Sequence, residues 1–375
     1  MRGIRKTALC ALCALLIGGA FPAGALAEEP PVKAGAAVLL EASTGKVLYA
    51  SDAHKKLPMA STTKVMTAIL VLERCALTES VTVTDEAYGT EGSSIYLERG
   101  EKLSVEDLLY GLMLASGNDA AVALAVHVAG SIEEFALLMN AKAKELGALD
   151  THFVTPNGLH DGGHYTTAYD LALISAYALK NESFRTIVST TYHRTETGSV
   201  QRTFKNKNKL LWQYEGGNGV KTGYTSDAGK CLSFAAARDN MQLVGVVLDC
   251  PDMFNAAIRL LDYGFKAYEM KLAVAAGDTI ARARVGAGVK NVLELVINED
   301  IMIPVERGAM AALKSRVVID EGIRAPVRAG DRLGTLELYD EGNKLLAACP
   351  LVAKDSVNAA DFGFYLNDLF GRWTA

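Results

Sequence analysis

Ala60-Ser61-Thr62-Thr63-Lys64-Val65 is the stretch on which the interpretation of this 375-residue chain depends. From Ser61 to about Glu73 the apolar residues recur at helical spacing, which predicts a helix that begins at this motif. Residues three apart share one face of a helix, so we expect the Ser61 hydroxyl beside the Lys64 amine. A lysine whose pKa is lowered by burial or by neighbouring cations can take the proton of a serine and make it a nucleophile.

The S-x-x-K motif alone is weak, because the chain contains a second one, Ser43-Thr44-Gly45-Lys46. That copy lies between two strand-like runs, 36–42 and 46–50, which predict a tight hairpin. Across such a turn the serine and the lysine do not share a helical face. For Ser61 itself, a helix N-cap is the alternative interpretation.

Two further motifs strengthen the case for Ser61. Ser116-Gly117-Asn118 follows an expected helix at 104–115, and Lys221-Thr222-Gly223 opens an expected strand at 222–225. Together with Ser61 and Lys64 they supply a nucleophile with its base, a hydroxyl to relay a proton, and donors for a carboxylate and an oxyanion. Acyl transfer at an amide requires these groups.

The rest of the chain predicts two folded parts. Helices are expected at 120–129, 132–146, 169–178 and 254–268, and strands at 231–237 and 242–248, so residues 33–272 form an α+β arrangement of a sheet with helices packed on it. From Val274 onward, short alternating stretches at 279–285, 292–297, 316–319 and 333–339 are separated by turn residues. This pattern of short alternating stretches between turns predicts a small all-β module of roughly 80 residues.

The two ends differ from the body of the chain. A basic start, an apolar run from Ala8 to about Ala20 and the small-residue site Ala25-Leu26-Ala27 predict a secretory signal peptide over 1–27. Residues 358–373 are rich in aromatic side chains and predict an amphipathic helix. Two interpretations of that helix remain open, contact with a membrane interface and packing on the protein itself.

Composition and residue spacing argue against a nucleic-acid partner, a disulfide framework and a metal site. The net charge is −5, and no Lys/Arg-rich run is interleaved with aromatics, so a nucleic-acid partner is not expected. Cys75, Cys231, Cys250 and Cys349 are scattered and favour free thiols, although Cys231 and Cys250 could sit on neighbouring strands. The pair His160 and His164 is interrupted by poor helix formers, so no metal site is expected.

The three motifs, in this order, resemble those of the low-molecular-weight penicillin-binding proteins, the serine-type D-alanyl-D-alanine carboxypeptidases. The likeness also extends to Thr155-Pro156-Asn157-Gly158-Leu159, to 164–170 and to 208–212. It covers about 33–272 and implies a penicillin-binding-protein/β-lactamase-like transpeptidase fold with an antiparallel sheet. The all-β module then corresponds to the C-terminal domain of that family, and no cofactor is implied.

The resemblance also implies roles for individual residues. Ser61 would attack the penultimate D-Ala of a peptidoglycan stem peptide, with Lys64 as general base. Ser116 and Asn118 would relay the proton and hold the substrate amide. Substrate binding would further use four residues of the K-T-G strand: Lys221 and Thr222 at the terminal carboxylate, Gly223, and Tyr224, whose N–H would join that of Ser61 in the oxyanion hole. β-Lactam antibiotics would acylate Ser61 and leave slowly.

One departure from the family concerns the carboxylate site. The stretch 248–253 contains no arginine, and Arg259 lies well inside the next expected helix. Recognition of the substrate carboxylate is therefore expected to rest on Lys221 and Thr222.

The expected organisation is a signal peptide at 1–27, a D,D-peptidase domain at 28–272, a β-rich domain at 273–352 and a membrane-associating tail at 353–375. The expected location is extracytoplasmic, at the cell wall or the outer face of the membrane. A serine β-lactamase and a secreted cell-wall-binding module with inactive motifs remain as alternatives. No E-x-x-x-N occurs between Asn118 and Lys221, where class A β-lactamases carry their deacylating glutamate.

Overall fold

The computed structural model describes residues 14–16, 28–308 and 312–373, and it divides between Ala267 and Tyr268 into two compact units. The first unit is α+β, as expected, and the second is built of strands with one C-terminal helix. The division falls slightly before the expected boundary at 272/273. The reason is that β11 (Tyr268–Val274) follows α8 directly and pairs with β14 (Ile301–Glu306) of the second unit.

The first unit is organised around a five-stranded antiparallel sheet. The strand order is β3 (Val47–Ser51), β2 (Ala36–Glu41), β10 (Met241–Leu248), β9 (Gly229–Arg238) and β8 (Gly217–Thr225). The expected hairpin is present, and the Glu41 carboxylate accepts hydrogen bonds from Ser43 and Thr44 in its turn. β8 is an edge strand, so alternate backbone groups along it lack a strand partner on the outer side.

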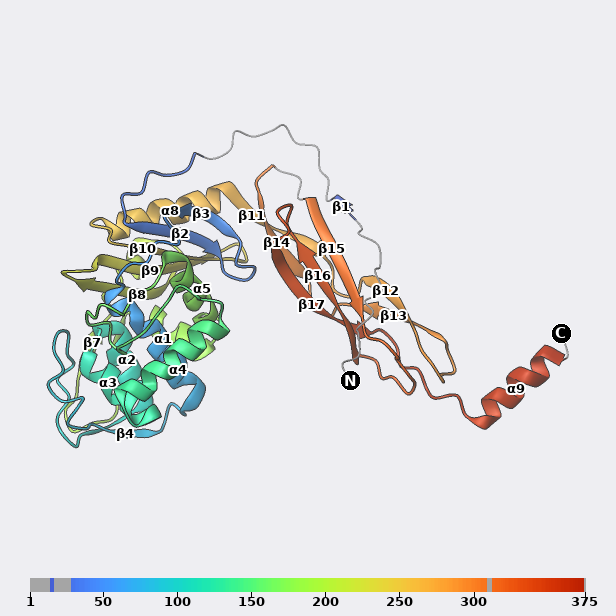
Figure 1. Ribbon diagram of the computed structural model, residues 1–375, viewed down its shortest axis with the longest axis horizontal. Coiled ribbons are helices and arrows are strands. Elements are labelled where there is room, and N and C mark those ends of the chain that lie inside the picture. The colour runs from blue at the N-terminus through green and yellow to red at the C-terminus, as the bar shows by residue number, and fades with distance from the viewer. Residues whose placement is uncertain (1–13, 17–27, 309–311, 374–375) are drawn as a thin grey trace. The chain divides into compact units, whose positions relative to one another are not determined.

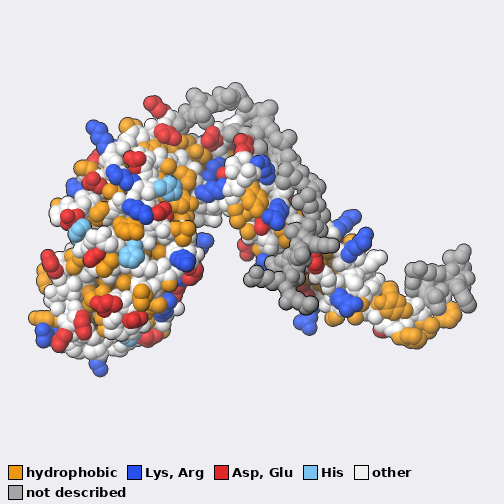
Figure 2. All heavy atoms as spheres, viewed as in Figure 1, with side chains coloured by type: hydrophobic (Ala, Val, Ile, Leu, Met, Phe, Trp, Pro, Cys, Tyr) orange, Lys and Arg blue, Asp and Glu red, His pale blue; other side chains and the backbone are white. Residues whose placement is uncertain are grey.

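Helices cover both faces of this sheet (Figure 1). α8 (Met253–Ala267) contacts β2, β3, β9 and β10, and Figure 1 shows it on the side opposite to α1 (Lys64–Arg74) and α5 (Ala168–Ala178). The remaining α-helices of the described part of this unit are α2 (Val105–Tyr110), α3 (Asn118–Ala129), α4 (Ile132–Glu145), α6 (Glu182–Ser189) and α7 (Leu210–Gln213). Two small two-stranded antiparallel sheets complete it: β4 (Ser80–Thr82) with β5 (Lys102–Ser104), and β6 (Tyr192–Arg194) with β7 (Thr203–Lys205). On the face shown in Figure 2, acidic and basic side chains are intermixed.

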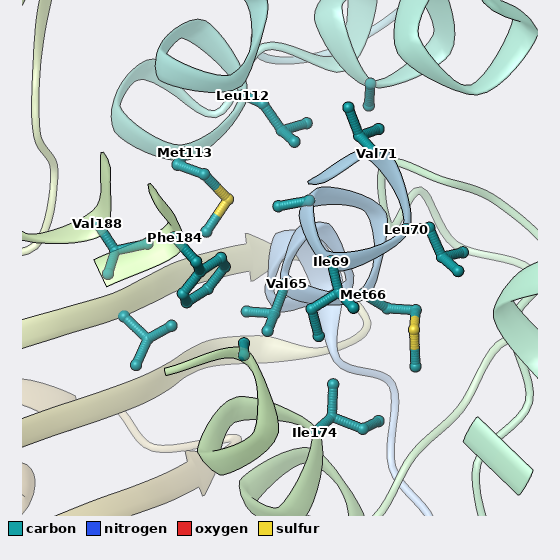
Figure 3. Close-up of a cluster of buried hydrophobic side chains, with 14 of the residues drawn as sticks. Val65, Met66, Ile69, Leu70, Val71, Leu112, Met113, Ile174, Phe184 and Val188 are labelled. Atoms are coloured by element: carbon teal, nitrogen blue, oxygen red, sulfur yellow. The ribbon is translucent and has the colours of Figure 1, made fainter. Parts of the chain in front are cut away.

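The core of this unit is built around α1, which is buried over its first eight residues. Figure 3 shows its apolar side chains, including Val65, Ile69 and Leu70, among those of neighbouring helices, with Leu112 and Phe184 close by. Eight consecutive residues cover every side of a helix, so the burial of Lys64–Val71 means that neighbouring elements surround this part of α1. The lysine motif at its N-terminus is thereby placed in the interior rather than at the surface.

Two expected helices differ from regular α-helix. Residues Ala60–Thr63 form a 3-10 turn, and α1 starts only at Lys64. The helix expected at 104–115 consists of α2 (Val105–Tyr110) and a π-helical turn, Gly111–Ala115, that ends at Ser116 in the left-handed conformation. Single π-turns are rare and are concentrated at functional sites. Both irregularities occur where a motif residue has to face the same site.

The second unit contains a six-stranded sheet in the order β1-β15-β16-β17-β13-β12. Its strands are β12 (Thr279–Arg284), β13 (Val292–Val296), β15 (Ala312–Ile319), β16 (Arg332–Tyr339), β17 (Leu345–Ala353) and the short β1 (Ala14–Leu16). The sequence did not predict β14 and β17, which contain Pro304 and Pro350, because proline opposes a strand assignment. β17 tolerates Pro350 because β13 pairs only with Val352 and Ala353, so one side of the strand is open at the proline.

The second unit continues past the expected end at 352. Val357 pairs with Val327, and the Ala360 N–H donates to the carbonyl of Ala287. α9 (Phe362–Trp373) follows, slightly shorter than the helix expected at 358–373.

Apart from Ala14–Leu16, the expected signal peptide lies outside the described residues. Cys75, Cys231, Cys250 and Cys349 are free thiols, with Cys231 and Cys250 buried. Within the described part of the chain, no single helix has the length and hydropathy needed to cross a bilayer. The pair α3 and α4 would reach that length together, but it is bent by 84° at its break.

We expect Leu70→Ala to lower the free energy of unfolding of the first unit by about 2–5 kcal/mol, because Leu70 is fully buried in the core and its loss leaves a cavity. Leu137→Ala on α4 is the control, since Leu137 is 62% exposed, and it should change that free energy by less than about 0.5 kcal/mol. Urea unfolding followed by far-ultraviolet circular dichroism measures both. Equal losses in the two variants would contradict the assignment of α1 as the core helix.

Candidate active site

Ser61 and Lys64 meet as the sequence predicts. Lys64 Nζ lies 2.8 Å from Ser61 Oγ. Ser61 lies in the 3-10 turn Ala60–Thr63 and Lys64 is the first residue of α1, so the two residues, three positions apart, share one helical face. Ser61 is half-buried, whereas Lys64 is fully buried.

The surroundings of the Lys64 amine determine where its lone pair points. Nζ lies 2.7 Å from Asn118 Oδ1 and 2.7 Å from the carbonyl oxygen of Asn157, and both atoms can only accept. A neutral amine donates its two N–H groups to these acceptors, which leaves its lone pair directed at the Ser61 hydroxyl. In that state the Ser61 O–H donates to Nζ, which is the geometry a general base requires.

Burial and two neighbouring cations favour the neutral amine. Burial holds the pKa of Lys64 well below its usual value, and the charges of Lys221 and Lys207 lower it further. Asp119 acts in the opposite direction. Burial, together with the charge of Lys207, also lowers the pKa of Lys221, to about 7. The site is therefore a cluster of three lysines in which two are fully enclosed.

The π-turn leads into Ser116 and Asn118, and of these two residues Asn118 contacts the Lys64 amine. Ser116 is buried with φ 67°, and α3 starts at Asn118. Two hydrogen bonds fix Asn118. Its side-chain Nδ2 donates to the carbonyl of Glu91 at 2.6 Å, and its backbone N–H donates to the carbonyl of Ser93 at 2.7 Å. These contacts fix its amide oxygen toward Lys64.

The K-T-G strand approaches the nucleophile along the edge of the sheet. Lys221, Thr222, Gly223 and Tyr224 lie on β8, which contacts the 3-10 turn. A Cβ atom at Gly223 would lie 3.0 Å from the Ser61 backbone nitrogen and 3.0 Å from the carbonyl oxygen of Met59. Glycine therefore allows the strand to run against the backbone of the nucleophile. Tyr224 is 69% exposed at the rim.

Three contributors to the site were not predicted from the sequence. Lys207 adds a cation, Asn157 supplies a backbone carbonyl to Lys64, and Glu91 orients Asn118. The contributions of Asn157 and Glu91 are backbone carbonyls, so their residue types carry no signal. Lys207 immediately precedes the stretch 208–212 that resembles the family, and this proximity was the only available indication.

Arg259 does not replace the missing arginine. It forms an ion pair with Asp252 at 3.7 Å near the start of α8. Among the described residues, Cys75, Glu79 and His127 bring possible metal-ligand atoms within 4.8 Å of one another. That group lies past the C-terminal end of α1, roughly 16 Å from Lys64 at 1.5 Å per residue, and takes no part in this site.

This arrangement can perform nucleophilic acyl transfer. The Ser61 hydroxyl faces a buried amine, the Asn118 amide oxygen contacts that amine, and β8 with Lys221 lies against the turn that carries Ser61. A nucleophile with its base, an amide and a lysine on the adjacent strand are groups that attack, proton transfer and binding of an anionic substrate end require.

Comparison with known proteins gives a consistent picture. Residues 24–252 match the family model of D-alanyl-D-alanine carboxypeptidases, and residues 268–359 match the C-terminal domain of penicillin-binding protein 5. The chain is 38% identical over 362 residues to D-alanyl-D-alanine carboxypeptidase DacF of Bacillus subtilis, covering 94% of this chain and 92% of the relative.

Solved structures agree with this match. Penicillin-binding protein 5 of Haemophilus influenzae superposes with a TM-score of 0.71 at 31% identity, covering 91% of this chain and all of the other. The PBP3 peptidoglycan synthesis regulatory factor of Streptococcus pneumoniae gives a TM-score of 0.77 at 26% identity, with 88% of this chain covered. The chain therefore belongs to the D-alanyl-D-alanine carboxypeptidase family, the serine peptidases also known as low-molecular-weight penicillin-binding proteins.

Proposed function

We propose that this carboxypeptidase removes the terminal D-Ala of peptidoglycan stem pentapeptides through an acyl-enzyme on Ser61. The observation that carries the proposal is the 2.8 Å separation of Ser61 Oγ from a buried amine whose other two hydrogen-bond directions are occupied. Such an amine is prepared to accept one proton, that of Ser61.

In the first step, Ser61 Oγ forms a bond to the carbonyl carbon of the penultimate D-Ala, and its proton passes to Lys64. The C–N bond to the terminal D-Ala then breaks, and the leaving nitrogen receives a proton relayed through Ser116. Asn118 holds the substrate amide. In the second step, water attacks the ester, its proton returns to Ser61 by way of Lys64, and the shortened peptide leaves.

Lys221 and Thr222 bind the terminal carboxylate of the substrate in this proposal, and the backbone N–H groups of Ser61 and Tyr224 stabilise the oxyanion. Two observations support it. Lys221 is a buried cation beside Lys64, and β8 lies against the Ser61 nitrogen at Gly223. Benzylpenicillin presents a carboxylate and a strained amide in a similar arrangement, so it would acylate Ser61 and hydrolyse slowly.

We further propose that the protein is exported and acts outside the cytoplasm, with α9 contacting the membrane surface. The basic and apolar start of the chain supports export. Phe362, Phe364, Tyr365, Leu366 and Phe370 of α9 are all exposed, and Figure 2 shows hydrophobic side chains gathered over this helix. Exposed aromatics on a short helix are typical of interfacial anchors.

Ser61→Ala should abolish release of free D-Ala from a pentapeptide ending in D-Ala-D-Ala, because the nucleophilic oxygen is removed. Intact-mass spectrometry after benzylpenicillin should show one covalent adduct on the wild-type chain and none on Ser61→Ala. Ser43→Ala, in the hairpin copy of the motif, is the matched control and should behave as wild type. A covalent adduct on Ser61→Ala would contradict the assignment of the nucleophile.

The pH profile of kcat/KM should be bell-shaped, because catalysis requires Lys64 neutral and Lys221 charged. The rate rises as Lys64 loses its proton, and it falls above about pH 7 as Lys221 becomes neutral. Lys221→Arg should move the falling limb to higher pH, since a guanidinium stays charged. Lys64→Arg should lower the acylation rate by at least about 100-fold at every pH, for the same reason. An unchanged falling limb in Lys221→Arg would assign that limb to another group.

Deletion of 361–375 should reduce co-sedimentation of the protein with vesicles of phosphatidylethanolamine and phosphatidylglycerol, because the exposed aromatic side chains of α9 are lost. Release of D-Ala from a soluble pentapeptide should be unchanged. Equal binding of the full-length and shortened chains would rule out an anchoring role for the helix.

A further inference from the structure

The residue before the nucleophile has an unusual backbone. Ala60 adopts φ +49°, in the left-handed region that residues with a Cβ rarely occupy. That conformation costs about 1–2 kcal/mol in an L-residue, so the surroundings must hold it in place. The carbonyl of Ala60 and the N–H of Ser61 belong to one planar peptide group. Whatever fixes the carbonyl therefore also fixes the direction of the Ser61 N–H.

A chain of buried hydrogen bonds ends on that carbonyl. Thr63 Oγ1 donates to the carbonyl oxygen of Ala60 at 2.8 Å, and His164 Nε2 lies 2.8 Å from the same hydroxyl. The backbone N–H groups of Val154 and Thr155 point at His164 Nδ1, at 3.0 and 3.3 Å. Thr63 and His164 are both almost completely buried.

The donors and acceptors of this chain can be assigned. A backbone N–H can only donate, so His164 Nδ1 accepts and the ring proton resides on Nε2. Nε2–H then donates to Thr63 Oγ1, whose own proton is directed at Ala60. Burial lowers the pKa of His164 to about 4, with His152 and His160 adding to this effect and Asp161 opposing it. The ring is therefore neutral near pH 7, as the assignment requires.

The peptide group is enclosed on its other sides as well. A Cβ at Gly158, which has φ +86°, would lie 2.0 Å from the Ala60 oxygen, so only glycine fits there. At the opposite end of the peptide group, the Ser61 nitrogen lies against Gly223 of β8. The Ser61 nitrogen thus lies beside the strand that also carries Tyr224, the other proposed oxyanion donor.

We propose that His164 and Thr63 are positioning residues that orient the Ser61 N–H as an oxyanion donor by holding the Ala60 carbonyl. Hydrogen bonds in a chain polarise one another, so donation to the carbonyl also makes the N–H of the same peptide a stronger donor. The proposal rests on the acyl-enzyme function proposed above and adds two residues that do not touch the substrate.

Two pairs of matched variants test the proposal. Thr63→Val removes the hydroxyl while preserving the branched shape, and Thr63→Ser keeps the hydroxyl. His164→Asn can still accept near the Nδ1 position but cannot reach Thr63, whereas the longer His164→Gln can place an N–H near Nε2. The acylation rate constant and the dissociation constant of the preceding non-covalent complex are measured separately with benzylpenicillin.

We expect Thr63→Val and His164→Asn to lower the acylation rate constant by about tenfold or more, in line with the loss of one oxyanion contribution. The non-covalent dissociation constant should change by less than about threefold, because the substrate-binding groups are untouched. Thr63→Ser and His164→Gln should recover most of the rate. A boronic acid analogue of N-acetyl-D-alanine, whose tetrahedral adduct places an oxygen at the oxyanion position, should bind more weakly in parallel with the rate.

The proposal is overturned if Thr63→Val and His164→Asn acylate within about twofold of wild type. It is also overturned if both variants at a position slow acylation equally and the slowing follows their loss of thermal stability. If His164→Asn does not fold, the threonine pair alone decides. The proposed function fails by a different result, the absence of an adduct on the wild-type chain, so the two failures are distinguishable.

Discussion

The constraint on which the rest of the site depends is the burial of the Lys64 amine, with no carboxylate among its hydrogen-bond partners in the described part of the chain. A lysine inside a protein usually pairs with an acid, and that pairing would keep it protonated and useless as a base. Here its hydrogen-bond partners are Ser61, an amide oxygen and a backbone carbonyl, and two further lysines repel its proton. The α1 core stabilises this unfavourable arrangement, because the apolar contacts beyond the motif hold the helix that carries it.

The fold brings the reacting groups together through departures from regular structure. A 3-10 turn carries Ser61 and leads into Lys64, a π-turn ends in a left-handed Ser116, and a left-handed Ala60 precedes the nucleophile. Each departure costs free energy locally, and each is compensated by packing or hydrogen bonds nearby. Regular helices and strands supply the rigid frame, and these short irregular segments aim the side chains.

The sequence predicted the frame and the motif residues well, because both depend on local patterns. Helical spacing located α1, α3, α4, α5 and α8, and the three motifs located Ser61, Lys64, Asn118 and Lys221. It did not predict what depends on backbone atoms or on distant contacts. Asn157 and Glu91 act through carbonyls, and His164 reaches Thr63 only once the loop 154–164 has folded over the turn. The strands that contain Pro304 and Pro350 were not predicted, because the side of each strand that has no partner is known only from the assembled sheets.

If Lys221 binds the substrate carboxylate as proposed, the three lysines also link substrate binding to chemistry. In the free enzyme, the charges of Lys221 and Lys207 lower the pKa of Lys64. A substrate carboxylate bound at Lys221 would offset part of that positive charge and raise the pKa of Lys64 again. The amine would then be a stronger base at the moment when the scissile carbonyl is in place. This coupling works only if the pKa of Lys64 in the free enzyme is low enough for the amine to remain neutral after the carboxylate binds and raises that pKa. Among the described residues, Lys64 contacts no acid and two cations lie near it. Both features lower the pKa of Lys64 in the free enzyme, so the pKa can rise on carboxylate binding while the amine stays neutral.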